Sequence, residues 1–217
     1  MKQIAVVLSG CGFKDGSEIH ESVLTLLAID KNNARYTCFA PDIDNIEIIN
    51  HITNQKTGEK RNVLIESARI ARGDIYPLNK FDAKNFDALV FPGGFGAAAN
   101  LSTFAIQGAD CSVNNEVSEA IAQMLKAKKP IGALCIAPVI LAKLIKNAEL
   151  TVGDCINTAS LIEKMGAVHK KSSATDIIID KTNKLITTPC YMLATRISQI
   201  AEGAEKLVKE ILNLTNG

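Results

Sequence analysis

A single cysteine stands at the point where a predicted strand changes into a predicted helix. Residues 130–138 read PIGALCIAP, with an apolar run typical of a buried strand, and the apolar residues after Cys135 repeat at helical spacing. A strand that runs straight into a helix turns sharply, so the side chain at the turn stands over the carboxyl edge of the sheet. The free amides of the helix point to the same place and lower the pKa of a thiol. The pattern therefore predicts a nucleophilic cysteine at this turn.

The same residues also fit a structural cysteine, because free cysteine is among the residue types most often buried. The six cysteines, at positions 11, 38, 111, 135, 155 and 190, include no CxxC pair and no His/Cys cluster of zinc spacing. A chain with its own hydrophobic core does not need disulfide bonds to fold. We therefore expect free thiols, no metal site and a cytoplasmic location.

Two carboxylates could act on the Cys135 thiol. Glu18 and Glu21 lie at the start of the first predicted helix, one turn apart and therefore on one face. One of them could shuttle protons to and from the thiol. The commoner role of a carboxylate at this position is to stabilise the helix N-terminus, and the sequence leaves both roles open.

A glycine-rich loop could supply hydrogen-bond donors. Gly93 and Gly94 follow Pro92 directly after a predicted strand, where glycines let the backbone pass close to a ligand and leave amide groups pointing outward. These amides, with the amide of Ile136, could hold a developing oxyanion beside Cys135. Glycine-rich loops also serve backbone geometry alone, so the loop by itself is weak support for a site.

The three histidines are His20, His51 and His169, and none is next to Cys135 in the sequence. A surface or structurally hydrogen-bonded histidine is the commoner case for each of them. His20 is the nearest to the predicted site because it lies in the site-lining helix start. Cys11, in the loop after the first strand, is a second thiol that could face the same crevice or simply be a small loop residue.

The composition fits one soluble globular domain over residues 1–217. The chain is 47% hydrophobic and 22% charged, and its 24 Lys and Arg residues nearly balance 23 Asp and Glu residues. The net charge of +1 gives no electrostatic reason to expect a nucleic-acid or membrane partner. The first apolar run, residues 4–8, is too short for a signal-peptide core or a membrane span.

The order of elements predicts the fold class. Buried strands are expected at residues 3–8, 35–40, 87–91 and 131–134, with helices between them, and a hairpin is expected at residues 176–180 and 184–188. This alternation indicates a doubly wound, mostly parallel sheet with a small antiparallel hairpin. The loops after three parallel strands, at residues 9–16 and 92–99 and at Cys135, would then share one crevice.

Several local details follow from the same patterns. Ser17 or Asp15 is expected to cap the first helix, and Asn114 the helix before the Cys135 strand. Residues 42–60 are expected to form a hairpin or flap over the sheet edge, and the last helix to span residues 193–212. The buried side of the first helix is expected to carry its apolar residues Val23, Leu24, Leu26, Leu27 and Ala28.

Taken together, the segments SGCGFKDGSEIHE, FPGGFGAAANLS, ALCIAP and TTPCYMLA resemble the ElbB family. That family lies in the PfpI and protein-deglycase branch of the class I glutamine amidotransferase-like superfamily. The similarity covers essentially the whole chain. It implies a flavodoxin-like fold, a cysteine at the strand-to-helix turn and a homodimer.

The resemblance assigns roles to individual residues. The family nucleophile falls on Cys135, its carboxylate on Glu21 with Glu18 as the alternative, and its amide donor on Gly94. Protease members of the superfamily carry a histidine directly after the nucleophile, where this chain has Ile136. A later histidine of the family triad has no counterpart near residues 157–158. These departures argue against peptidase and glutamine-hydrolysing activity.

The resemblance implies a glyoxalase, that is, a lyase that converts glyoxal-type dicarbonyls to hydroxy acids without glutathione or another cofactor. Cys135 would add to an aldehyde carbon, Gly94 and Ile136 would hold the alkoxide, and Glu21 would move the proton. The alternative is a regulatory or redox-sensing protein, linked by the family name to isoprenoid metabolism, in which the same cysteine is oxidised without turnover.

Overall fold

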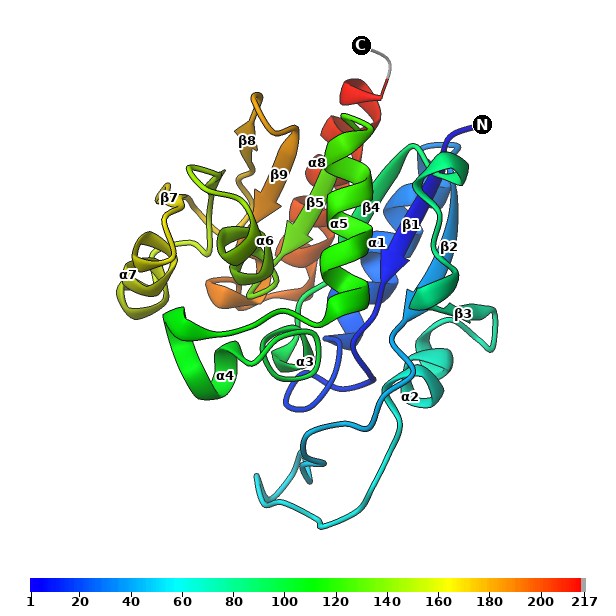
Figure 1. Ribbon diagram of the computed structural model, residues 1–217, viewed down its shortest axis with the longest axis vertical. Helices are drawn as coiled ribbons and strands as arrows, with labels where there is room; N and C mark the ends of the chain where they lie inside the picture. Colours follow the sequence, from blue (N-terminus) through cyan, green and yellow to red (C-terminus); the bar gives the residue numbers. More distant parts are fainter. Residues whose placement is uncertain (216–217) are drawn as a thin grey trace.

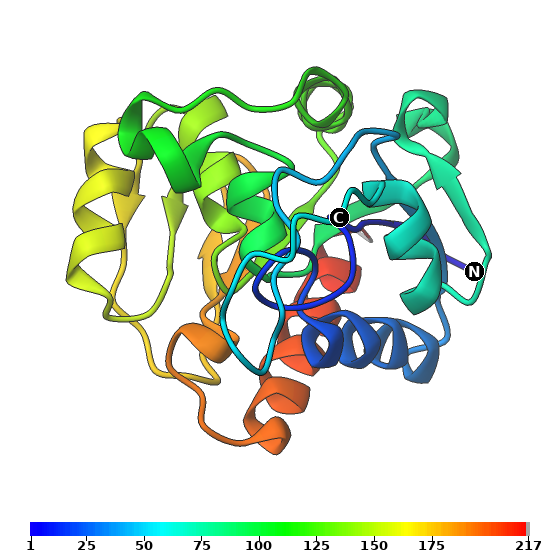
Figure 2. The same cartoon turned by 90° about the horizontal axis from the view of Figure 1, so that it is seen from below.

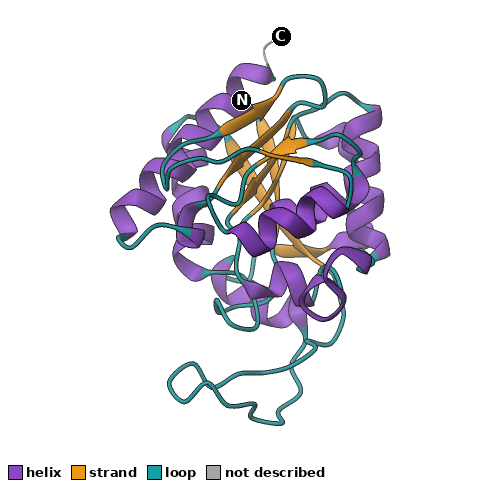
Figure 3. Ribbon diagram, turned by 90° about the vertical axis from the view of Figure 1, so that its left-hand side faces the viewer, coloured by secondary structure: helices purple, strands orange, loops and turns teal. Residues whose placement is uncertain are grey.

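The structure, a computed structural model that describes residues 1–215, is a seven-stranded sheet covered by helices on both faces (Figures 1 and 3). The strand order is β3-β2-β1-β4-β5-β9-β8, and every neighbouring pair is parallel except β8 and β9. The sheet strands are β1 Gln3–Val7, β2 Arg35–Ala40, β3 Ile75–Pro77, β4 Ala88–Phe91, β5 Ile131–Leu134, β8 Ile178–Asp180 and β9 Leu185–Thr188. The expected mostly parallel sheet with an antiparallel hairpin is confirmed.

The helices alternate with these strands along the chain. They are α1 Ile19–Lys31, α2 Val63–Ile70, α3 Phe95–Ala99, α4 Phe104–Gln107, α5 Asn115–Lys126, α6 Pro138–Leu144, α7 Ile156–Lys164 and α8 Ile197–Leu214. Two short strands, β6 Glu149–Leu150 and β7 Val168–His169, pair separately beside α7. Among residues 1–215 no helix is long and apolar enough to cross a membrane.

The apolar sequence of β1 follows from its position in the middle of the sheet. Ile4 and Val6 pack on one face with residues of α1 and α8, whereas Ala5 and Val7 pack on the other with residues of α3, α5 and α6. Because successive side chains of a strand point to opposite faces, a strand covered on both faces must be apolar throughout. Figure 2 shows α1, in blue, lying alongside the red end of α8 beneath the sheet.

The start of α1 differs from the expectation. The cap is Glu18, whose carboxylate accepts a hydrogen bond from the Glu21 amide, and neither Ser17 nor Asp15 caps the helix. Ser17 instead accepts a hydrogen bond from the Ser9 amide at 2.8 Å, which ties the loop to the end of β1. The helix begins later because tertiary contacts occupy the two expected caps.

The buried face of α1 is also more polar than expected. Val23 and Leu27 are nearly half exposed, whereas Glu21, Ser22 and Thr25 are fully buried. Leu26 and Ala28 are buried as expected. The apolar pattern therefore identified part of the buried face and missed its polar residues, because a carboxylate at a buried position is the rarer case.

The last helix begins at Ile197 and not at residue 193. The chain after β9 first forms a short 3-10 turn, Cys190–Met192, in which Cys190 has a φ of +43°. A positive φ in a non-glycine residue interrupts helical geometry, so the helix cannot continue back through this turn.

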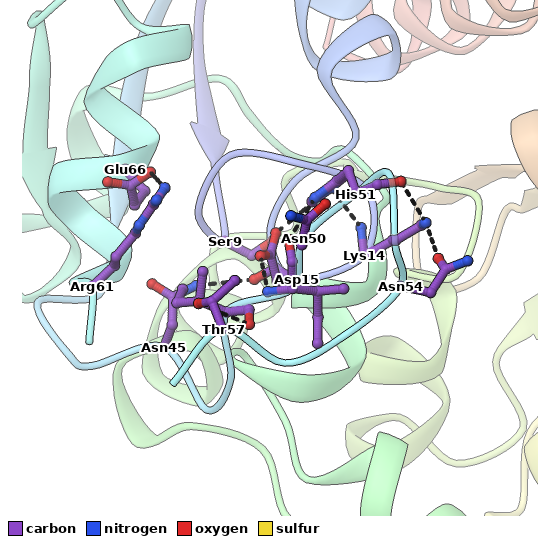
Figure 4. Close-up of polar contacts among 12 residues, drawn as sticks. Ser9, Lys14, Asp15, Asn45, Asn50, His51, Asn54, Thr57, Arg61 and Glu66 are labelled. Atoms are coloured by element: carbon purple, nitrogen blue, oxygen red, sulfur yellow. Dashed lines mark hydrogen bonds and ion pairs between the residues drawn. The ribbon is translucent and has the colours of Figure 1, made fainter. Parts of the chain in front are cut away.

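Residues 42–62, which include the flap expected at residues 42–60, project from the body in Figures 1 and 3 and do not lie flat over the sheet edge. This segment has isolated antiparallel bridges, between Asp44 and Asn62 and between Ile49 and Lys56, but no regular strand. The carboxylate of Asp15, labelled in Figure 4, accepts a hydrogen bond from the Ile49 amide at 2.8 Å, which fastens the flap to the loop after β1. Lys14 Nζ donates to the backbone carbonyl of His51 at 2.9 Å.

The Asn114 cap of α5 is confirmed, because its side-chain oxygen accepts hydrogen bonds from the amides of Glu116 and Val117. We expect Asn114→Ala to lower the free energy of unfolding by about 1 kcal/mol, since two helix amides lose their acceptor. Urea denaturation checks this. Asn115→Ala, one residue later and inside the helix, is the matched control and should change stability by less than about 0.5 kcal/mol. Equal losses in the two variants would contradict the capping role.

Candidate active site

Cys135 occupies a sharp turn between β5 and α6, as the sequence predicted. Its φ is +59°, a conformation that a residue with a side chain adopts only when its surroundings impose it. The Cys135 amide donates to the carbonyl oxygen of Thr188 at 2.9 Å, so the ladder between β5 and β9 holds the turn. The side chain stands at the carboxyl edge of the parallel strands.

The glycine loop after β4 lies directly against this cysteine. A Cβ atom on Gly93 would lie 2.3 Å from Cβ of Cys135 and 2.3 Å from Oε2 of Glu21. A Cβ atom on Gly94 would lie 2.3 Å from the Glu18 amide nitrogen, and Gly94 also has a φ of +100°. Only glycine fits at either position. The loop therefore brings the Glu21 carboxyl and Cys135 to one point.

Glu21 is fully buried and is held from several sides. Its Oε1 accepts a hydrogen bond from the Tyr191 amide at 3.0 Å. Among residues 1–215, Oε2 has no partner at normal hydrogen-bond geometry, and this oxygen faces Cys135 and Gly93. The second carboxyl oxygen is therefore the one available to the thiol.

Burial raises the pKa of Glu21 from 4.5 to about 8, because a charge at this position would lose its hydration. The Tyr191 amide opposes this rise, the negative charge of Glu18 adds to it, and contacts with Cys135 and Gly93 lower the pKa again. A carboxyl with this pKa carries its proton at neutral pH. Glu21 is thus a neutral acid next to a thiol.

The expected acidic thiol is not what the structure indicates. Burial raises the pKa of Cys135 well above its usual range, and negative charge on Glu21 would raise it further. The Gly94 amide faces the sulfur and lowers the pKa, but by less than burial raises it. The sequence argument considered the helix dipole alone, whereas Cys135 is only 7% exposed. A neutral Glu21 removes the like-charge repulsion that would otherwise oppose the thiolate.

The other residues predicted for the site differ in how they relate to Cys135 and Glu21. Glu18 lies at the site, but its carboxylate caps α1 through the Glu21 amide at 2.6 Å, which is the structural role that the sequence left open. Ile136 begins the turn into α6 directly beside Cys135, and its side chain packs into both hydrophobic cores. Cys11 is half-buried and packs against the hydrophobic cluster that contains Cys135, and its place in the site stays a prediction.

The histidines are distributed as the sequence suggested. His20 lies at the rim, where its Nδ1 is 2.8 Å from the hydroxyl oxygen of Tyr191. His51 belongs to the flap, with Nε2 3.8 Å from an oxygen of Asp15. His169 accepts a hydrogen bond from the Val152 amide near β7. Within residues 1–215, no three His, Cys, Asp or Glu side chains are grouped to hold a metal ion.

Sequence reasoning missed Tyr191 and Cys190 as neighbours of the site. Tyr191 binds the Glu21 carboxyl through its amide, and a charge on Cys190 would raise the pKa values of Cys135 and Tyr191. The available signal was that these residues follow β9, the strand next to β5, at the same carboxyl edge.

No protein-family model matches the chain. It is 45% identical to the ES1 protein homolog, mitochondrial, of Rattus norvegicus, over 98% of this chain and 84% of the rat protein. It is 44% identical to the human glutamine amidotransferase-like class 1 domain-containing protein 3, mitochondrial, over 98% of this chain and 83% of the human protein. The names of these relatives contradict the expected cytoplasmic location. Free thiols fit any reducing compartment, so they could not decide it.

Among solved structures, the chain resembles an isoprenoid biosynthesis protein with an amidotransferase-like domain from Ehrlichia chaffeensis. The TM-score is 0.90 and the identity 36%, over 97% of this chain and 99% of that one. Glyoxalase III from Candida albicans has the same fold, with a TM-score of 0.65 and 10% identity over 98% and 97% of the two chains. The resemblance inferred from the sequence is confirmed for the class I glutamine amidotransferase-like superfamily. From its identity to the rat and human proteins over nearly its whole length, the chain belongs to the ES1 family of glutamine amidotransferase-like class 1 domain proteins.

Proposed function

We propose that the protein is a cofactor-independent glyoxalase that converts small dicarbonyls such as glyoxal to hydroxy acids. The observation that carries the proposal is the buried pair of Cys135 and Glu21: a thiol at a sharp turn faces the free oxygen of a carboxyl that is protonated at neutral pH. A nucleophile and a proton carrier in contact are what the proton shift between the two carbons of the adduct requires, before water releases the acid.

The reaction needs three steps at these groups. The sulfur of Cys135 adds to one aldehyde carbon, and the thiol proton is transferred to the aldehyde oxygen, which the amides of Gly94 and Ile136 stabilise. Glu21 then gives its proton to the oxygen of the second aldehyde and takes the proton from the carbon bonded to sulfur, which leaves an enediol. Glu21 returns this proton to the adjacent carbon and takes the hydroxyl proton from the sulfur-bearing carbon, so the adduct becomes the thioester of a hydroxy acid and Glu21 is protonated again. Water cleaves the carbon–sulfur bond, releases the acid and restores the thiol.

The groups around Cys135 favour this chemistry over amide hydrolysis. Within residues 1–215, the titratable side chains that act on the pKa of Cys135 are Glu21 and Cys190, and no histidine is among them. Hydrolysis of a glutamine or peptide bond needs an acid that protonates a leaving amine, usually a histidine beside the nucleophile. An aldehyde has no leaving group, so a single carboxyl that accepts and returns a proton is sufficient.

The low exposure of the site favours a small substrate. Cys135 is 7% exposed and Glu21 is fully buried, so a substrate of a few heavy atoms fits the contact between them better than a sugar or a peptide. In the alternative function, a redox sensor, the same Cys135 is oxidised. The name of the Ehrlichia protein is the reason to connect this alternative with isoprenoid biosynthesis. Turnover separates the sensor from the enzyme, because a sensor consumes one equivalent of reagent.

Cys135→Ser should fold normally and lose dicarbonyl turnover by at least about 10³-fold, because a hydroxyl without an adjacent histidine base is a far weaker nucleophile than a thiol. Purified protein is incubated with glyoxal or methylglyoxal without cofactor, and the hydroxy acid is followed by NMR. Cys111→Ser, at another buried cysteine, is the control for the loss of a buried sulfur and should retain turnover. Full activity in a folded Cys135→Ser protein would exclude the covalent mechanism.

The proton on Glu21 should appear in the pH dependence of stability. The folded protein keeps this proton up to about pH 8, whereas the unfolded chain loses it near its ordinary pKa of 4.5. Between these values the folded state binds more protons, so the free energy of unfolding should fall as pH rises, by up to about 1.4 kcal/mol per pH unit for this group. Urea denaturation from pH 5 to 8 should show this slope, and Glu21→Gln should reduce it.

Glu21→Gln should also lower dicarbonyl turnover by about 10² to 10⁴, because an amide cannot accept and return a proton. In the wild type, turnover should fall as pH rises through about 8, where Glu21 loses its proton. NMR assays at matched pH values measure both effects. A Glu21→Gln protein with wild-type turnover would show that the carboxyl only completes the packing at the start of α1.

A further inference from the structure

The turn after β9 is bonded twice to the first turn of α1. The Tyr191 amide donates to Oε1 of Glu21 at 3.0 Å, and the Tyr191 hydroxyl is 2.8 Å from Nδ1 of His20. The two partners are consecutive residues of α1, but His20 is at the surface and Glu21 is buried. One tyrosine thus contacts both the rim and the interior of the site, through its side chain and its backbone.

The backbone bond determines which carboxyl oxygen carries the proton. Because Oε1 accepts from the Tyr191 amide, it acts as the carbonyl-type oxygen of the neutral carboxyl. The proton is then on Oε2, the oxygen that faces Cys135 and the Gly93 backbone. If the Tyr191 amide moved away, the carboxyl could turn and the proton would no longer be directed at the sulfur.

Cys190 and Ala194 of this turn are buried in the hydrophobic core, but the backbone hydrogen bonds of the turn do not reach α1 apart from that of the Tyr191 amide. The turn's own hydrogen bonds are short-range, from the amides of Leu193 and Ala194 to the carbonyl of Cys190 and from the Met192 amide to Pro189. Cys190 has a φ of +43°, which costs energy in a non-glycine residue and aims the next amide at Glu21. The phenol–imidazole bond is therefore a contact between side chains that keeps the turn against α1.

The Tyr191 hydroxyl keeps its proton, because burial raises its pKa and negative charge on Glu18 raises it further. The bond joins this hydroxyl to Nδ1 of His20, and the imidazole tautomer sets which of the two atoms donates. The imidazole ring lies 5.9 Å from the phenol ring, tilted by 47°. Glu18 Oε1 is 3.9 Å from the same nitrogen.

We propose that Tyr191 and His20 form a positioning pair: their side-chain hydrogen bond holds the Tyr191 amide on Glu21 and so directs the carboxyl proton to Cys135. The expected effect of this pair on turnover rests on the proposed function. Its expected effect on the Glu21 carboxyl follows from the geometry alone. Neither residue touches the reacting atoms in this scheme.

The test uses Tyr191→Phe, His20→Ala, the double variant and His20→Gln, with Tyr36→Phe as the control at an exposed tyrosine of β2. The first readout is the titration of the Glu21 carboxyl by ¹³C NMR, assigned by its loss in Glu21→Gln. The Tyr191 amide lowers the pKa of Glu21, so loosening the turn should move the midpoint upward from about 8, by half a pH unit or more, in either single variant. Tyr36→Phe should titrate as the wild type does.

The second readout is turnover of glyoxal. Either single change should lower kcat about tenfold with little change in KM, since the substrate contacts remain. The double variant should be no worse than the single ones, because both remove the same bond. His20→Gln can accept the phenol hydrogen through its side-chain oxygen and should recover part of the loss.

The outcomes distinguish a failure of the proposed function from a failure of the positioning pair. If the wild type turns over no dicarbonyl, the proposed function fails, but the ¹³C titration still decides the positioning pair. An unchanged Glu21 midpoint in both Tyr191→Phe and His20→Ala would overturn the pair. Losses in kcat that multiply in the double variant would also overturn it, because they would mean that the two residues act independently.

Discussion

A carboxyl group buried without a counter-charge is the constraint on which the site depends. Moving an ionised carboxylate out of water is far more costly than keeping it protonated, so Glu21 stays neutral to about pH 8. This neutral acid can lie against a thiol without opposing the negative charge that develops on sulfur. Around it, the chain supplies one amide from Tyr191, a loop without side chains at Gly93, and the thiol of Cys135.

The sheet brings these groups together. β1, β4 and β5 are neighbours in the middle of the sheet, and β9 follows directly beside β5. The segments that leave their carboxyl ends carry Glu21, Gly93, Cys135 and Tyr191. Ligands bind at this edge of open parallel sheets because the loops diverge there and leave free backbone groups. The apolar residues on both faces of β1 keep the strands fixed, and hence the loops at their ends.

The family relation and the chemistry rest on different observations. Identity of 45% to the rat protein over nearly the whole chain establishes the family, and a TM-score of 0.90 to the Ehrlichia protein establishes the architecture. The likeness to glyoxalase III at 10% identity concerns the fold alone. One fold supports many reactions, so the proposed reaction is argued from the contact between Cys135 and Glu21. The flap is fastened to the loop after β1 through Asp15.

The sequence by itself determined the fold class, the order of strands and helices, the Asn114 cap and the turn at Cys135. These follow from local rules: apolar periodicity, capping side chains and a change of period at a single residue. The sequence also identified Glu21, Gly93 and Gly94 as candidate site residues, because the loops that follow parallel strands lie at the same edge of the sheet. What only the tertiary structure decided was the electrostatics and the partners. Burial raised the thiol pKa that the helix dipole was expected to lower, and Glu18 proved to be the cap. The Tyr191 amide binds Glu21, which is 170 residues away in the sequence. Desolvation and long-range contacts depend on what surrounds a group in space, and no local pattern in the chain encodes them.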